Sequence, residues 1–248
     1  MDLYGLIGNP VSHSLSEKYF SDKFAVQNID AGFQNFLLSN IDGLPGILDT
    51  YPQLKGLSVT SPLKKDVIAY CNVIDANAKE IMAVNALKIQ KKDKGFYIKG
   101  YNTDIDGFAI AMIPILKASK PGALILGSGG AARAVALALK RMGIQFLIAS
   151  RKAGQGKLSY DDLNEKHFRT HRLIINATPL GMPKYSDQYP PIPYHFISKS
   201  HIIFDLNYNP PMTPFLLKGK ERQAETHNGL VMLQAQAEKS WVIWNSKQ

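Results

Sequence analysis

The chain has 248 residues, 45% of them hydrophobic and 20% charged, and a net charge of +9. This composition is that of an ordinary globular protein of one large or two smaller domains, and it excludes a disordered or fibrous chain. The single cysteine, Cys71, excludes a disulfide framework and any metal site built from several cysteines. The positive charge favours anionic ligands, although many soluble proteins are basic without a specific anionic partner.

The first residues, MDLYGLIGNP, do not have the basic and then long apolar pattern of a signal peptide. The longest apolar run has nine residues from Phe108, which is too short to span a membrane. Cys71 lies in the apolar stretch DVIAYCNVI, where we expect a buried, inert thiol. We therefore expect a cytoplasmic protein that does not enter the membrane.

Apolar runs alternate with helix-like segments from the start of the chain, and this pattern predicts an α/β fold. Residues 3–8 predict a buried strand, and the large apolar side chains after it have helical spacing. NALKIQ and GFYIKGY flank KKDK and predict a hairpin. The other elements expected before residue 102 are strands at AGFQNFLL and KGLSV and helices at DGLPGILDTY, LKKDVIAYC and IDANAKEIM.

A boundary is expected near residue 102, with a unit of three or four strands before it. After it, residues 104–118 have helical periodicity, with Pro114 as a possible kink. Residues 153–172 are too few for a full strand-helix unit, so one such unit is expected to be reduced. The remaining elements are a strand, tight turn and helix at ALILGSGGAARAVALALKRMG, parallel strands at 146–150, 173–177 and 202–206, and a final helix at 230–244.

The tight turn carries a dinucleotide-binding pattern. Gly127, Gly129 and Ala132 match G-x-G-x-x-A between a predicted strand and a predicted helix. The first glycine permits the turn, the second lets a pyrophosphate approach the backbone, and the small third residue lets helix and strand pack closely. Phosphates would then lie at the positive end of the helix. The alternative is a plain strand-to-helix turn.

The end of the next strand indicates which dinucleotide is bound. An NAD site usually has an acidic residue there, to bond the ribose hydroxyls. Here Ser150 and Arg151 occupy that place, and no carboxylate follows until Asp161. An arginine can bind a 2′-phosphate that a carboxylate would repel. The sequence therefore favours NADP(H), unless the cations here are merely exposed.

Polar residues mark a second candidate site in the first half of the chain. Ser12, Ser14 and Ser16 begin the first predicted helix, where hydroxyls and free amides can bind a carboxylate or simply cap the helix. Several further polar groups follow predicted strands or helices, as they do around a cleft above a parallel sheet. They are Thr60, Lys64, Asn85, Asn102, Thr103 and Asp104.

Seven segments occur in an order that resembles the shikimate dehydrogenase family over essentially the whole chain: GNPVSHSLS, VTSPLK, VNAL, GYNTDIDG, GSGGAARA, INATPLGM and NGLVMLQAQA. The resemblance implies NADPH-dependent reduction of 3-dehydroshikimate to shikimate, in the biosynthesis of chorismate and aromatic amino acids. It implies a substrate-binding catalytic domain at 1–102 and a Rossmann-like NADP-binding domain at 103–226. Residues 227–248 would pack back on the first domain.

The resemblance also implies roles for single residues. Lys64 and Asp104 match the family's catalytic pair, and Ser14 and Ser16 match its carboxylate-binding hydroxyls. Further substrate contacts are implied for Thr60, Asn85, Tyr208 and Gln236. Cofactor contacts are implied for Gly127, Ser128, Gly129, Gly130, Ala131, Ser150, Arg151, Ala177, Thr178 and Gly229. No metal is expected, and the protein would be a monomer or a homodimer.

Ketone chemistry explains why a lysine would be needed. Reduction requires a hydride on carbon, which the nicotinamide supplies, and a proton on oxygen, which a protein acid must supply. A lysine beside the carbonyl can donate that proton, and a nearby aspartate favours its charged form. Our hypothesis is that Lys64 is the acid/base, Asp104 its partner and Lys65 a solvated neighbour.

The chain departs from the family at three points: Glu17 follows Ser16 where proline is common, Phe20-Ser21 replaces His-Asn, and Ser150 replaces asparagine. Two alternatives stay open. One is a quinate/shikimate dehydrogenase with broader substrate or NAD use. The other is a non-catalytic NADP(H) sensor, which would not need Lys64 and Asp104. No stripe of lysines interleaved with aromatics points to nucleic acid.

Overall fold

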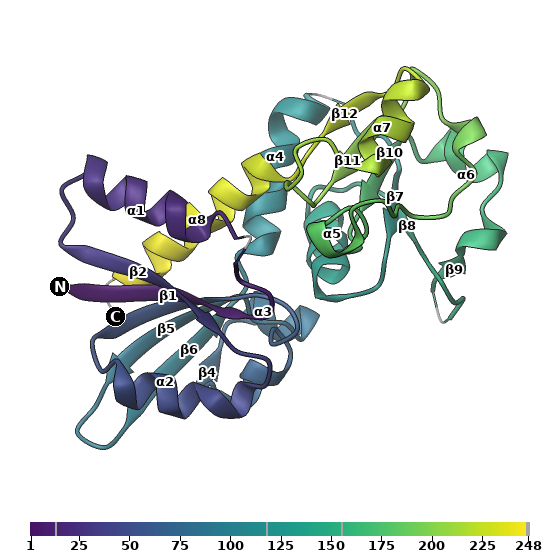
Figure 1. Cartoon of the computed structure of the whole chain (residues 1–248). Helices are drawn as coiled ribbons and strands as arrows, with labels where there is room; N and C mark the ends of the chain where they lie inside the picture. Colours follow the sequence, from purple (N-terminus) through teal and green to yellow (C-terminus); the bar gives the residue numbers. More distant parts are fainter. Residues whose placement is uncertain (13, 118, 155, 247–248) are drawn as a thin grey trace. The chain divides into compact units, whose positions relative to one another are not determined.

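The computed structural model describes residues 1–12, 14–117, 119–154 and 156–246. The chain divides into two compact units, one of Met1–Thr103 with the chain from Gln236 onward, and one of Asp104–Ala235. Each unit holds one six-stranded sheet with helices beside it (Figure 1). The α/β class predicted from the sequence is confirmed.

The sheet of the first unit has the strand order β2-β1-β3-β5-β6-β4. β1 is parallel to β2 and β3, whereas β5 is antiparallel to both β3 and β6. The expectation of three or four strands was wrong, because both strands of the KKDK hairpin join this sheet and the short β4 pairs with β6. The elements are β1 (Asp2–Gly8), α1 (Ser16–Val26), β2 (Ala31–Leu37), α2 (Leu44–Thr50), β3 (Leu54–Val59), β4 (Val73–Ile74), α3 (Ala76–Ile81), β5 (Ala86–Lys91), β6 (Phe96–Tyr101), and 3₁₀-helices at Ile41–Gly43 and Asp66–Tyr70.

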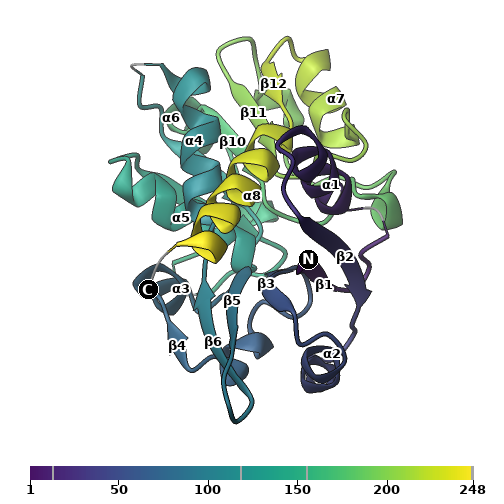
Figure 2. The same ribbon diagram turned by 90° about the vertical axis from the view of Figure 1, so that its left-hand side faces the viewer.

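Successive side chains of β1 point to opposite faces of the sheet, so the buried residues of this unit form two layers, one on each face. Leu3 and Ile7 belong to a cluster with Leu44 of α2, whereas Tyr4 belongs to one with α1 and with Trp244 of α8 (Leu230–Asn245). Figure 2 shows α1 and α8 together, away from α2. The chain from Gln236 onward is thus part of the core of the first unit.

The sheet of the second unit is fully parallel, in the order β12-β11-β10-β7-β8-β9. Helices cover both faces, because Ile203 of β11 packs in a cluster with α6 and α7 while Phe204 meets Phe108 of α4. Apart from residue 155, which is not described, residues 153–172 hold a two-residue strand and two short helices, so this unit is reduced as expected. The elements are α4 (Asp104–Leu116), β7 (Ala123–Leu126), α5 (Gly130–Arg141), β8 (Phe146–Ser150), β9 (Leu158–Ser159), α6 (Glu165–Thr170), β10 (Leu173–Asn176), β11 (Ile202–Asp205), α7 (Pro214–Glu221), β12 (Glu225–His227), and 3₁₀-helices at Tyr160–Asp162, Pro183–Tyr185 and Tyr194–Phe196.

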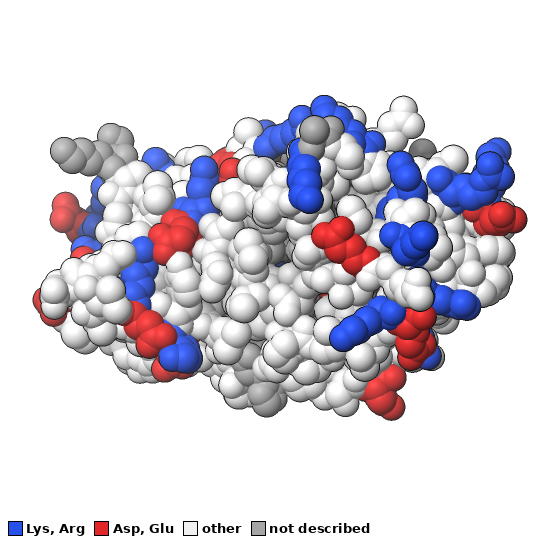
Figure 3. All heavy atoms as spheres, turned by 90° about the horizontal axis from the view of Figure 1, so that it is seen from above, with Lys and Arg blue, Asp and Glu red and all other residues white. Residues whose placement is uncertain are grey.

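On the face shown in Figure 3, Asp and Glu side chains stand between the Lys and Arg side chains. Cys71 is half-buried rather than fully buried, and burial raises the pKa of its thiol to about 11. Within the described ranges, the helices are too short or too polar to cross a membrane.

Candidate functional site

The first candidate feature is a pair of hydroxyls where α1 begins. The hydroxyl of Ser14 donates to that of Ser16 over 3.1 Å, and the Ser16 N–H donates to the Ser14 Oγ over 3.2 Å. The N-cap position belongs to Leu15, which makes no side-chain cap, so neither serine occupies that position. Ser14 is half-buried and Ser16 buried. The two hydroxyls form a joined polar group that a carboxylate could bind.

The family departures in α1 have structural reasons. Glu17 accepts a hydrogen bond from the Asn35 side chain of β2 over 2.5 Å. Phe20 is fully buried and stacks on Phe33, with ring centroids 4.7 Å apart. The helix is therefore held to the sheet by these residues, and Ser14 and Ser16 keep their place where it begins.

The second feature is a hub around the buried amide of Asn85. Its Oδ1 accepts the Thr103 N–H over 2.7 Å, and its Nδ2 lies 3.1 Å from the Thr103 hydroxyl and 3.3 Å from Gln236 Oε1. Ser240 of α8 lies 3.2 Å from the same Thr103 hydroxyl. The hub brings together two predicted substrate contacts, Asn85 and Gln236, which are far apart in sequence.

The third feature is the turn that carries the candidate lysine. Two backbone bonds tie this turn to the Asn85 segment: the Val59 N–H donates to Asn85 O over 2.8 Å, and the Val84 N–H donates to Lys64 O over 2.8 Å. Lys64 is half-buried, whereas Lys65 is exposed. Since Thr60 begins the same turn, the structure gathers Thr60, Lys64 and Asn85 beside one another within the first unit.

The glycine loop of the second unit has the geometry that a dinucleotide needs. Gly127 follows β7 with a φ of +114°, which L side chains rarely adopt, and a Cβ there would lie 3.1 Å from Ala177 O. At Gly129, the N-cap of α5, a Cβ would have no atom within 4 Å. Ala132 is fully buried, as close packing of helix and strand requires. The residues present therefore fit a pyrophosphate at the start of α5.

Ser150 and Arg151 stand where β8 ends, beside the glycine loop. β8 pairs with β7 up to Ala149, and the Gly127 N–H donates to Ala149 O over 2.8 Å. The Ser150 hydroxyl donates to Lys152 O over 2.9 Å, and the Arg151 side chain is exposed. An exposed guanidinium at this strand end fits the 2′-phosphate of NADP.

Three loops where β10, β11 and β12 end carry the remaining predicted residues of this unit. Ala177 and Thr178 follow β10, Tyr208 lies after β11, and Gly229 follows β12. Their link is a pair of buried residues that sequence reasoning missed, Asp205 and Asn207. A signal was available, because Asp205 ends an otherwise apolar strand, IIFD, and is followed by a polar loop.

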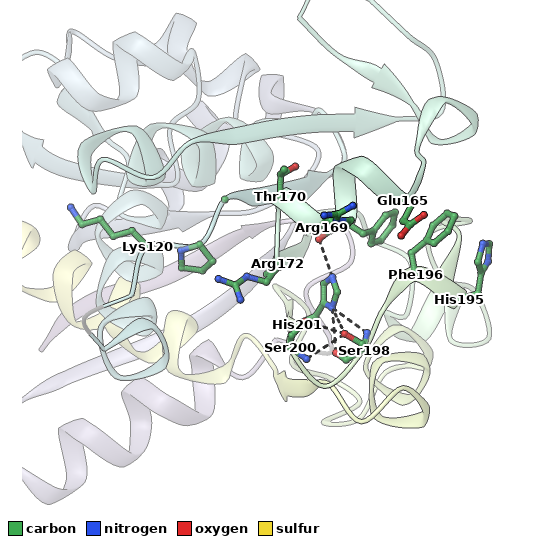
Figure 4. A pocket seen from close by; sticks show the side chains of 13 residues that line it. Lys120, Glu165, Arg169, Thr170, Arg172, His195, Phe196, Ser198, Ser200 and His201 are labelled. Atoms are coloured by element: carbon green, nitrogen blue, oxygen red, sulfur yellow. Dashed lines mark hydrogen bonds between the residues drawn. The ribbon is translucent and has the colours of Figure 1, made fainter.

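A hollow of about 700 Å³ lies at the opposite edge of this sheet, where β7, β10 and β11 begin (Figure 4). Lys120, Arg169 and Arg172 line it, and all three are exposed. The buried ring of His201 is bonded within the protein, with Nε2 3.1 Å from Phe168 O and Nδ1 3.1 Å from the Ser198 N–H. Solvated cations and a satisfied histidine do not require a ligand, so we do not place the site here.

Comparison with known proteins decides the family. Residues 6–87 match the family described as the shikimate dehydrogenase substrate binding domain. The NADP(+) shikimate dehydrogenase of Carboxydothermus hydrogenoformans is 34% identical, with 98% of this chain and 91% of that protein covered. The chain belongs to the shikimate dehydrogenase family.

Solved structures of shikimate dehydrogenases share the fold. The enzyme of Peptoclostridium difficile has a TM-score of 0.86 and 33% identity, with 100% of this chain and 93% of that chain covered. The enzyme of Thermus thermophilus, in complex with NADP(H) and shikimate, has a TM-score of 0.84 and 27% identity over 99% of this chain and 94% of its own. The shikimate dehydrogenase fold therefore spans essentially the whole chain.

Within each unit the structure brings predicted residues together. In the first unit these are Thr60 with Lys64 and Asn85, Asn85 with Gln236, and Ser14 with Ser16. In the second they are the glycine loop with Ala177, and Tyr208 with Gly229 through Asn207. Lys64 belongs to the first unit and the buried Asp104 begins α4 of the second, so their pairing stays a prediction.

Proposed function

We propose that the protein reduces 3-dehydroshikimate to shikimate with NADPH. The observation that supports this most is the 34% identity to a shikimate dehydrogenase (NADP(+)) over 98% of the chain. The open glycine loop with Arg151 beside it supports NADP as the cofactor, and the Thr60, Lys64 and Asn85 group supports a polar substrate in the first unit.

Lys64 is the proton donor in the proposed reaction. Bound NADPH supplies the hydride that reaches the ring carbon. Lys64 gives its proton to the ketone oxygen and stabilises the charge that develops there. Asp104 keeps the ammonium protonated and in place. In the oxidising direction the deprotonated lysine takes the proton from the hydroxyl.

The other residues bind and orient the two ligands. Ser14 and Ser16 hold the substrate carboxylate, because both hydroxyls can donate to it once the Ser14 hydroxyl rotates away from Ser16. Thr60, Asn85, Tyr208 and Gln236 make further contacts to the substrate. The cofactor is held by Gly127, Ser128, Gly129, Gly130, Ala131, Ser150, Arg151, Ala177, Thr178 and Gly229. We accordingly assign substrate binding to residues 1–102 with 227–248, and nucleotide binding to residues 103–226.

The test is an absorbance assay of the purified protein with shikimate or quinate, each against NADP⁺ and NAD⁺. We expect nicotinamide reduction with shikimate and NADP⁺. Faster turnover with quinate or with NAD⁺ would instead favour the broader dehydrogenase. If no combination reduces the nicotinamide, the proposed activity is wrong, and NADP⁺ binding without turnover would identify a sensor.

A further inference from the structure

The three loops at the carboxyl edge of the second sheet are joined by one residue, Asn207. We call residues 176–182, 206–210 and 228–229 the clamp loops. Asn207 lies in the second of them and donates from Nδ2 to Thr178 O over 3.1 Å and to Leu180 O over 2.9 Å in the first. The backbone carbonyl of Asn207 accepts the Gly229 N–H of the third loop over 3.1 Å. Asn207 therefore bonds to every loop of the set.

Asp205 holds Asn207 in turn, and its two carboxylate oxygens have different partners. Oδ1 accepts the Asn207 N–H and the Asn176 side-chain amide, both over 3.0 Å. Oδ2 accepts the Thr213 hydroxyl over 2.6 Å, and that hydroxyl caps α7 by accepting the Leu216 N–H. Oδ1 thus accepts hydrogen bonds from the clamp loops, and Oδ2 accepts one from the residue that caps α7.

The surroundings allow little movement. Asp205 has no exposed surface, and a buried carboxylate is costly unless donors surround it. Burial raises its pKa to about 7 even though hydrogen bonds from Thr213, Asn207 and Asn176 lower it. A Cβ on Gly229 would lie 2.0 Å from Leu206 O, so the second and third loops are in close contact. Releasing one loop would therefore disturb its neighbour.

We propose that Asp205 and Asn207 are positioning residues, which hold the clamp loops in the arrangement that binds the dinucleotide. The inference rests on the proposed function for the identity of that ligand, because the loops carry the proposed contacts Ala177, Thr178 and Gly229. The Oδ1 atom of Asp205 does the positioning, whereas Oδ2 only stabilises α7.

The test compares two variants of the same residue in the full chain. Asp205→Ala removes both acceptors, so the Asn207 N–H loses its acceptor and the Asn176 amide keeps only its bond to Leu180 O. We expect it to raise the dissociation constant for NADP⁺ about tenfold or more, and to speed hydrogen exchange in the clamp loops. Asp205→Asn keeps an amide oxygen for both loop donors, and its NH₂ can donate to Thr213. We expect binding within about threefold of the wild type.

Thr213→Val is the matched structural control. It removes the bond to Oδ2 and the cap of α7, so it should lower the urea midpoint and speed exchange at the start of α7. It should leave exchange in the clamp loops and NADP⁺ binding unchanged. If Asp205→Ala does not fold, Asn207→Ala tests the inference instead, because it removes only the two side-chain hydrogen bonds from Asn207 to the first loop. It should speed exchange in residues 176–182 and weaken NADP⁺ binding.

The outcomes separate this inference from the proposed function. Unchanged loop exchange in both Asp205→Ala and Asn207→Ala would overturn the inference, as would a Thr213→Val variant that weakens NADP⁺ binding as much as Asp205→Ala does. A wild-type protein that binds no NADP⁺ would remove the proposed function and with it the ligand assignment of the clamp loops. Hydrogen exchange in the variants would still show whether Asp205 and Asn207 hold those loops in place.

Discussion

The two units hold their candidate site residues with chemically different hubs. In the first unit the hub is Asn85, an amide that is 6% exposed. In the second it is Asp205, a carboxyl group with no exposed surface. An amide can both donate and accept and does not titrate, whereas a buried carboxyl group has donors around it and is costly to ionise. The candidate site residues of the two units should therefore respond differently to mutation and to pH.

The largest effect is expected for a variant of the first unit that should impair proton transfer and leave nucleotide binding by the second unit unchanged. Lys64→Ala should lower kcat about 10²- to 10⁴-fold, the usual contribution of a positioned general acid. The dissociation constant for NADP⁺ should not change. Steady-state kinetics and a binding titration measure the two quantities. Lys65→Ala, one position along and exposed, is the control and should keep full activity. Normal turnover by Lys64→Ala would remove the lysine from the mechanism.

The titration of Asp205 should make the free energy of unfolding depend on pH. Its pKa is about 7 in the folded protein because burial raises it, and about 4 in an unfolded chain. Between these values the folded state holds a proton that the unfolded state has lost, so the free energy of unfolding should fall as the pH rises. The slope from this group has a limit of about 1.4 kcal/mol per pH unit.

Urea denaturation of the wild type and Asp205→Asn across this interval checks the sign. The variant cannot titrate at this position, so its stability should fall less steeply with rising pH. Tyr194, a titratable residue near Asp205, has its pKa raised, mainly by burial, and stays neutral in the interval. Equal slopes in the two proteins would show that Asp205 is ionised throughout.

A smaller effect is expected at the exposed edge of the nucleotide half. Arg151→Ala should raise the dissociation constant for NADP⁺ about 10- to 100-fold, because a charge-assisted bond to the 2′-phosphate is lost. Binding of NAD⁺, which has no such phosphate, should stay the same. Lys120→Ala removes one charge at the opposite edge of the same sheet and should change neither constant. An equal loss of NADP⁺ affinity in both variants would mean that the affinity depends on the net charge of the protein and not on a bond from Arg151 to the 2′-phosphate.

The amide hub of the first unit should show a loss that does not depend on pH. Asn85→Ala leaves the Thr103 N–H, in a residue that is 1% exposed, without its acceptor. We expect the free energy of unfolding to fall by about 1–3 kcal/mol, equally at acidic and neutral pH. Ser240→Ala leaves the Asn85 bonds in place and should cost less. A loss that grew with pH would contradict the contrast between the two hubs.

Local chemistry made much of the fold predictable. The strand, turn and helix around Gly127 follow from an apolar run, a glycine that adopts positive φ, and a run of good helix formers. The KKDK hairpin and the reduced segment at 153–172 were predictable for the same reason. β4, β9 and β12 were missed, because strands of two and three residues show no periodicity.

The sequence by itself determined the α/β class, the glycine loop, the basic end of β8 and, through its motifs, the family. Only the tertiary structure decided which polar groups meet. Asn85 and Gln236 are 151 positions apart, and Asn176 and Asp205 are 29 apart. Turn chemistry and side-chain periodicity act over a few residues. Asn176 and Asp205 meet because β10 and β11 pair side by side, and Asn85 and Gln236 meet because the chain from Gln236 onward packs in the first unit.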